Sequence, residues 1–210
     1  MLVVFIIYLE KNQGKIFILF CLKLVLFMKK EMKLLLVVSA FSSLAGGLLA
    51  PIYAIFVKDI GGDLLTAGGA YSVYAIATGV LIFFMSKWED SIKHQEKLIV
   101  IGYLIQTIGF FGYVFVTKPI HLFIIQALFG VSKAVWTPAY DGIYSKNLDK
   151  GKFASEWGIW ESMNWTIIGI AALIGGLIAN MFGFNFLFLT MFSLSAIGFL
   201  FSINLLKKKK

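Results

Sequence analysis

Six apolar segments dominate the sequence, and short polar connections separate them. The segments are residues 34–57, 64–86, 98–116, 122–144, 160–182 and 186–206. Each is close to the roughly 20 residues that a helix needs to cross the roughly 30 Å hydrocarbon core of a membrane. Lipid offers backbone N–H and C=O groups no partner, so a spanning segment must satisfy them itself. We therefore predict an all-α integral membrane protein with six transmembrane helices in residues 32–210.

The composition argues against a soluble enzyme. Hydrophobic residues make up 60% of the chain and charged residues 14%, whereas soluble domains have about 45–50% and about 25%. The single cysteine, Cys21, has no partner for a disulfide, and His94 and His121 lack the spacing of metal ligands. No nucleophile is paired with a base. We therefore expect no enzymatic activity, no cofactor and no metal site.

The lysines indicate how the helices are oriented. The chain has no arginine, and lysines give it a net charge of +8. Lysines gather before the first segment, in connections 87–97 and 145–156, and at the C-terminus, whereas the alternate connections contain only Lys58 and Lys118. Since basic residues beside membrane helices stay in the cytoplasm, we predict a cell-membrane protein with both termini cytoplasmic. The positive charge is then explained by the orientation of the helices and by contact with anionic lipid. We expect no nucleic-acid partner.

The N-terminal segment, residues 1–31, fits this pattern poorly. Its apolar run 2–9 is too short to span a membrane, and Lys23 interrupts the run 16–27. No small-residue cleavage site follows, so a signal peptide is not indicated. The segment is either interfacial or lies upstream of a true start at Met28 or Met32.

A short motif repeats in the first and fourth segments. Pro51 and Tyr53 form a Pro-x-Tyr motif in the first, and Pro138 and Tyr140 form another in the fourth. Their matched positions suggest that the chain consists of two related units of three helices. Because three is an odd number of spans, the two units cross the membrane in opposite orientations. We therefore predict a 3+3 inverted repeat in which Pro51 and Pro138 act as helix hinges.

Residues 32–206 resemble the amino-terminal half of a major facilitator superfamily (MFS) transporter. The resemblance rests on the six-segment layout, on the charged connection after the second segment with Asp90 at the family's acidic position, and on Gly175 and Gly176 in the fifth segment. Gln126 stands where the family has a basic residue. The resemblance implies a secondary transporter that works by alternating access. It also implies a second six-helix half, supplied by another copy of this chain or encoded separately.

Lys133 is the most informative polar residue because it lies at the centre of the fourth segment. A charge at that depth costs at least roughly 2.5–3.5 kcal/mol, so it should face a wet cavity or a partner. We interpret Lys133 as the binding charge for an anionic or carboxylate solute. The alternative is a lysine that snorkels or packs against a neighbouring helix.

Further polar and aromatic side chains lie within the apolar segments. They suit a cavity that orients a small organic solute, although each alone also fits a helix-packing contact. The predicted solute-binding residues, besides Lys133, are Gln106, Gln126, Asn164, Trp165, Tyr53, Tyr74 and Trp136. Asp90, Asp141 and Glu161 lie toward the cytoplasmic ends of their helices, and we predict gating or ion-coupling roles for them.

The sequence thus predicts a transporter, or half of one, whose partners are the lipid bilayer, a small solute and a second six-helix half. Two other classes remain open. The chain is alternatively a non-transporting membrane partner or a truncated transporter fragment, or else a six-span channel or lipid-handling protein.

Overall fold

The computed structural model describes residues 29–207, and the chain within that range is helical throughout, without strands. The predictions for the N-terminal segment therefore fall almost entirely outside the described residues. The elements are α2 (Lys30–Leu49), η1 (Ala50–Ile52), α3 (Tyr53–Asp59), α4 (Leu64–Glu89), α5 (Gln95–Gly112), η2 (Tyr113–Phe115), α6 (Pro119–Asn147), α7 (Phe153–Ser202) and η3 (Ile203–Leu206).

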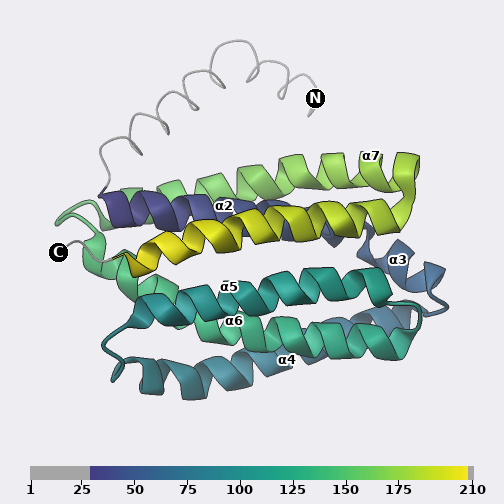
Figure 1. The fold of residues 1–210 in the computed structure, drawn as a ribbon, viewed down its shortest axis with the longest axis horizontal. Helices are drawn as coiled ribbons and strands as arrows, with labels where there is room; N and C mark the ends of the chain where they lie inside the picture. The colour runs from purple at the N-terminus through teal and green to yellow at the C-terminus, as the bar shows by residue number, and fades with distance from the viewer. Residues whose placement is uncertain (1–28, 208–210) are drawn as a thin grey trace, which may run out of the picture.

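Five helical stretches of the described chain are long and apolar enough to cross a membrane. They are Lys30–Asp59, Leu64–Glu89, Gln95–Phe115, Pro119–Asn147 and Phe153–Leu206. The last contains both the fifth and sixth predicted segments. It is interrupted at Gly183, whose φ of 79° and ψ of 173° are not helical, and there the chain turns back on itself (Figure 1). Within residues 29–207 the predicted all-helical fold is confirmed, whereas the six membrane passes stay a prediction.

Helices extend past the predicted segments where lysines are dense. α2 begins at Lys30, α4 ends at Glu89, α6 ends at Asn147 and α7 begins at Phe153. Hydropathy identifies only the part of a helix that matches hydrocarbon, whereas the helix itself continues into the charged headgroup layer.

The two matched prolines have different effects on their helices. At Pro51 the first span changes from α2 to the 3-10 turn η1 and then continues as α3. Pro138, in contrast, lies within the continuous helix α6. Proline removes one helical hydrogen bond and crowds the preceding turn, but neighbouring helices can hold such a helix together in a membrane.

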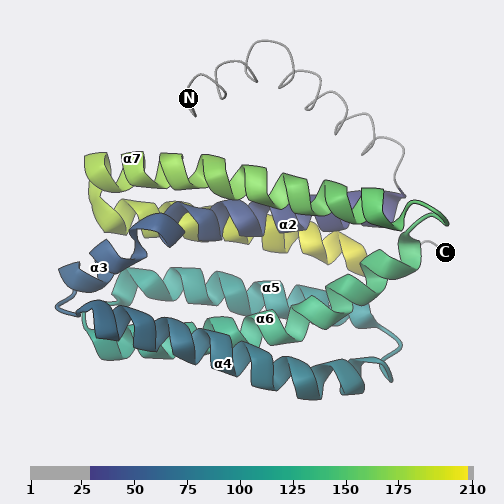
Figure 2. The same cartoon turned by 180° about the vertical axis from the view of Figure 1, so that it is seen from behind.

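The helices run alongside one another, and their connections are sorted to two ends (Figures 1 and 2). One end holds the start of α2, the α4–α5 and α6–α7 connections and the end of η3. The other holds α3, the α5–α6 connection and the turn at Gly183. The lysine-rich connections therefore share one end of the bundle, called here the lysine-rich end.

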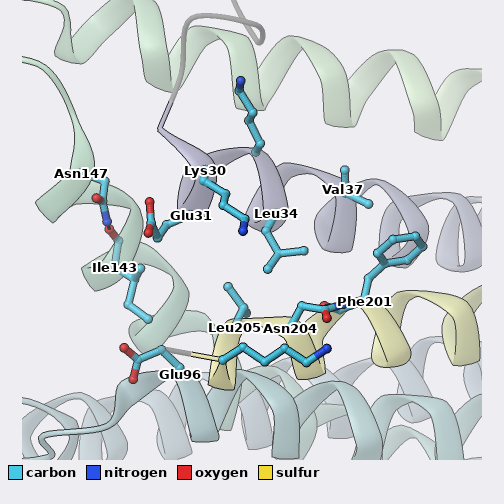
Figure 3. A pocket seen from close by; sticks show the side chains of 12 residues that line it. Lys30, Glu31, Leu34, Val37, Glu96, Ile143, Asn147, Phe201, Asn204 and Leu205 are labelled. Atoms are coloured by element: carbon cyan, nitrogen blue, oxygen red, sulfur yellow. Dashed lines mark hydrogen bonds between the residues drawn. The ribbon is translucent and has the colours of Figure 1, made fainter. Parts of the chain in front are cut away.

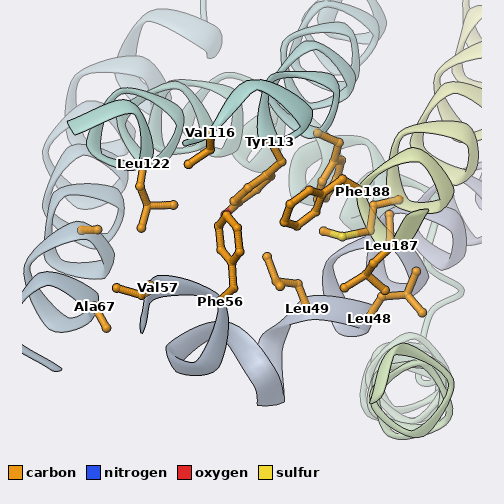
Figure 4. Packing of buried hydrophobic residues seen from close by; sticks show 14 of the residues in the cluster. Leu48, Leu49, Phe56, Val57, Ala67, Tyr113, Val116, Leu122, Leu187 and Phe188 are labelled. Atoms are coloured by element: carbon orange, nitrogen blue, oxygen red, sulfur yellow. The ribbon is translucent and has the colours of Figure 1, made fainter. Parts of the chain in front are cut away.

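Two clusters of buried apolar residues fill the bundle. The first lies toward α3 and is rich in rings: the centroid of Phe188 is 4.8 Å from that of Phe56 and 5.1 Å from that of Tyr113 (Figure 4). The second lies toward the lysine-rich end and contains Tyr103 and Tyr140. Between the clusters α2, α5 and α6 each contribute polar side chains, among them Ser42, Gln106 and Ser132, so a polar layer crosses the middle of the bundle.

Helices α2 and α7 approach each other closely through glycine. A Cβ atom at Gly175 would fall on the carbonyl group of Leu48, which is backbone and cannot move aside. A Cβ atom at the neighbouring Gly176 would meet nothing within 4 Å. Small residues allow this kind of backbone contact between membrane helices, where van der Waals packing holds the helices together.

We predict that Gly175→Ala destabilises the protein and that Gly176→Ala does not. In both variants alanine favours the helix over glycine by about 1 kcal/mol. Only Gly175→Ala, however, forces α2 away from α7. Overpacking of this kind costs about 1–3 kcal/mol. Thermal unfolding of the two variants in detergent measures the difference, and equal melting temperatures would contradict the α2–α7 contact.

Candidate functional site

A small pocket of about 120 Å³ lies in the polar layer. Four helices contribute to it: α2, α4, α5 and α6. Its lining residues are Ser42, Tyr74, Gln106, Phe129, Ser132, Lys133 and Trp136. The structure therefore brings together Lys133, Gln106, Tyr74 and Trp136, which the sequence analysis selected from three separate segments.

Lys133 lies at the midpoint of α6, about 21 Å of helical rise from either end. Its Nζ is 4.2 Å from the centroid of the Trp136 ring, within the range of a cation–π interaction. Within residues 29–207 its ammonium forms no hydrogen bond and no ion pair, although it attracts Asp141 two turns further along α6. The ammonium is thus held by an aromatic face and keeps its hydrogen-bond donors available to the pocket.

Gln106 is fixed by a reciprocal contact with α2. Its Nε2 donates to Ser42 Oγ at 2.8 Å, and Ser42 Oγ lies 3.1 Å from Gln106 Oε1. Tyr74 enters from α4, where its ring packs 5.7 Å from that of Tyr71. The pocket therefore combines one ammonium, one amide, hydroxyl groups and three aromatic rings, a set that can orient a small polar molecule.

Gln126 and Tyr53 form a different polar group, nearer α3. Gln126 Nε2 donates to Tyr53 Oη at 3.0 Å and to Tyr113 Oη at 3.3 Å. These bonds tie α6 to α3 and η2 beside the aromatic cluster. The two residues do not line the pocket around Lys133.

The neighbouring residues Asn164 and Trp165 face in different directions, one into the bundle and the other outward. The buried Asn164 Oδ1 accepts from Ser43 Oγ at 2.6 Å and from Ser39 Oγ at 3.0 Å, which joins α7 to α2. Trp165 is 69% exposed, and its Nε1 donates to Glu161 Oε2 at 3.1 Å on the outer surface of α7. Neither residue lines the Lys133 pocket.

The predicted gating carboxylates lie in different environments. Asp141 is half-buried near Lys133, whereas Asp90 is exposed at the C-terminal cap of α4. The ion pairs of the described chain join Asp149 to Lys29 and Lys152 and include none of the three predicted carboxylates.

Four residues that, in the described chain, line the pocket or are buried with an unpaired carboxylate were not predicted from the sequence. Ser42, Phe129 and Ser132 line the pocket, and Glu89, beside Asp90, is buried with neither carboxylate oxygen hydrogen-bonded among the described residues. The occurrence of serine within apolar segments was the available signal for Ser42 and Ser132. Nothing in the sequence indicated that Glu89, and not Asp90, would be the buried carboxylate of the two. No group of three metal-ligating side chains occurs within residues 29–207.

A comparison with known protein families identifies the fold. The family model described as Major Facilitator Superfamily matches residues 35–210. The chain belongs to the major facilitator superfamily. It is therefore a multi-pass membrane protein of a transporter family, as its sequence predicts, and the Lys133 pocket lies within the part of the chain that the MFS model matches.

One curated relative is an "Uncharacterized MFS-type transporter MJ1560" from Methanocaldococcus jannaschii. It is 26% identical to this MFS chain over 147 residues. The alignment covers 70% of the chain but 38% of the relative. The chain thus spans well under two thirds of the length of the relative that it matches.

We predict that Asn164→Ala destabilises the protein more than Trp165→Ala. The first change removes the hydrogen-bond partner of the buried Ser39 and of the partly buried Ser43, and such contacts between membrane helices contribute about 0.6–1.7 kcal/mol each. The second removes a ring that is mostly outside the bundle. Thermal unfolding of both variants in the same detergent gives the ranking, and the reverse order would mean that Trp165, not Asn164, faces the neighbouring helix.

Proposed function

We propose that this chain is one half of a secondary transporter that moves a small solute across the membrane by alternating access. The solute binds in the pocket around Lys133, between this half and a second six-helix half. Family membership supports a transport role, and one observation supports this particular site. That observation is the ammonium of Lys133, at mid-helix and without a hydrogen-bonded partner within residues 29–207, facing a polar pocket.

The chemistry of the pocket favours a solute with a carboxylate or another anionic group. An ammonium at the middle of a membrane is costly unless water or an anion solvates it. Gln106 and Tyr74 offer an amide and a hydroxyl group to the rest of the solute. Ring faces from Trp136 and Phe129 suit its apolar part.

The size of the pocket supports a second half. A volume of about 120 Å³ holds an anionic group but falls below the roughly 300–1,000 Å³ of typical ligand sites. Large apolar side chains are exposed on α4 and on the first arm of α7, among them Phe84 at 64% and Leu173 at 70%. We propose that a second half, either another copy of this chain or a separate polypeptide, covers part of this surface and completes the site.

We further propose that α7 crosses the membrane twice, with its turn at Gly183, so that the chain makes six passes as a 3+3 inverted repeat. Both termini then lie in the cytoplasm of a cell-membrane protein. The sorting of the lysines supports this orientation, since the connections at the end opposite the lysine-rich end contain only Lys58 and Lys118.

Asp141 is the carboxylate best placed to respond to the solute. It attracts Lys133 along α6, so an anion that neutralises the lysine would weaken this attraction. The altered balance would then favour movement of α6 at Pro138, where the helix lacks one hydrogen bond. We propose that Asp141 acts in this way as a gating residue.

We predict that Lys133→Ala abolishes most solute binding and uptake and that Lys133→Arg restores part of both. A hydrogen bond to a charged group contributes about 1.5–3 kcal/mol, so uptake should fall about tenfold or more. Proteoliposomes are tested with radiolabelled lactate, succinate and glutamate, with glucose as the neutral comparison. Thermal stabilisation of the purified protein by the same solutes reports binding.

Lys118→Ala is the matched control, because Lys118 lies in a connection at the end of the bundle and not in the pocket. The control should behave like the unaltered protein. Flux that rises linearly with concentration without saturation would favour a channel. The proposal is wrong if none of the probes binds or moves, or if Lys133→Ala equals the control.

A further inference from the structure

A second cavity, of about 550 Å³, opens at the lysine-rich end of the bundle (Figure 3). It lies between the start of α2, the start of α5, the end of α6 and the end of the chain around η3. It is separate from the Lys133 pocket, with which it shares no lining residue. Its position suggests a ligand at the edge of the membrane and not a transported solute.

The lining of this cavity changes from charged to apolar with depth. Along α2 it passes from Lys30 to Val37, about 10 Å further into the membrane. Along the end of the chain it passes from Lys207 to Phe201. Val37 and Phe201 remain 38% and 42% exposed, so the apolar part of the cavity leaves surface that an acyl chain could cover. A phospholipid has the same order of polarity at this depth of a bilayer.

Charges of both signs line the outer part of the cavity. Lys30, Lys33 and Lys207 contribute ammonium groups, and Glu31 and Glu96 contribute carboxylates. Figure 3 shows the carboxylates of Glu31 and Glu96 on the side of α6, next to Asn147 and Ile143, and the Lys30 side chain extending toward the centre. Within residues 29–207, Lys30, Lys207, Glu31 and Glu96 form no ion pair and no side-chain hydrogen bond.

We propose that this cavity binds one phospholipid whose headgroup carries both a phosphate and a primary amine. The phosphate lies against Lys30 and Lys207, the amine donates to Glu31 and Glu96, and an acyl chain follows Val37 and Phe201. A headgroup with a phosphate alone would leave both carboxylates opposite a like charge. A soluble aminophosphate would leave the apolar wall uncovered. The proposal does not depend on what the chain transports.

Native mass spectrometry of the full-length protein, delipidated in detergent and then mixed with one lipid at a time, tests this assignment. The probes are phosphatidylethanolamine, phosphatidylglycerol and phosphatidylcholine with identical acyl chains. We expect one phosphatidylethanolamine to be retained per chain, about fivefold more tightly than the other two. Phosphatidylcholine keeps the positive charge but has no N–H donor, so it isolates the contribution of the amine.

Substitutions then separate the two kinds of charge. Glu31→Gln together with Glu96→Gln should remove the preference for phosphatidylethanolamine over phosphatidylglycerol. Lys30→Ala should weaken binding of phosphatidylethanolamine and of phosphatidylglycerol about fivefold, the effect expected of one lysine at an anionic lipid. The matched control is Lys93→Ala, an exposed lysine at the same end of the bundle but outside the cavity. Folding of each variant is checked by its melting temperature.

Three outcomes would overturn the proposal. They are equal retention of the three lipids, an unchanged lipid preference in the glutamine variants, and displacement of the lipid by millimolar phosphoethanolamine. The last would mean that a free aminophosphate is the ligand and that the apolar wall does not contribute.

Discussion

One ammonium group in the middle of a membrane-spanning helix constrains this structure more than any other feature. Lys133 must be solvated or paired, because hydrocarbon cannot stabilise its charge. The bundle meets that requirement with the ring of Trp136 and with a small polar pocket to which four helices contribute. The apolar clusters on either side then close the bundle above and below the charged layer.

Several of the hydrogen bonds that join the helices lie at a similar depth. Asn164 links α7 to α2, and Thr107 Oγ1 lies 2.9 Å from Ser195 Oγ, which links α5 to the second arm of α7. Ser132 Oγ donates to the carbonyl oxygen of Gly102 at 2.8 Å, which links α6 to α5. Together with the close packing at Gly175, these polar contacts favour one rotation of each helix that they join. The pocket is the part of this polar layer that the surrounding side chains do not fill.

Much of this arrangement could be predicted from the sequence, because hydropathy measures the length and depth of a span. Lys133, Gln106 and Tyr74 each lie near the middle of a segment, so the sequence predicts that they share one depth in the membrane. It does not predict that they line one pocket. The direction that each side chain takes was not evident, since the segments are apolar on nearly all sides and carry little sign of which face is buried. Gln126 and Trp165 were predicted to line the same cavity as Lys133, yet Gln126 bonds to Tyr53 nearer α3 and Trp165 lies on the outer surface.

Water access to the Lys133 pocket is the most direct test of the account. Ser42→Cys, made in a Cys21→Ala background, places a thiol in the pocket, and Ile108→Cys places one on the exposed face of the neighbouring α5. The account predicts that a membrane-impermeant, charged thiol reagent modifies the first in intact vesicles and not the second, which faces lipid. Equal resistance of both thiols to that reagent, with both modified by a lipid-soluble maleimide, would contradict a water-filled site around Lys133.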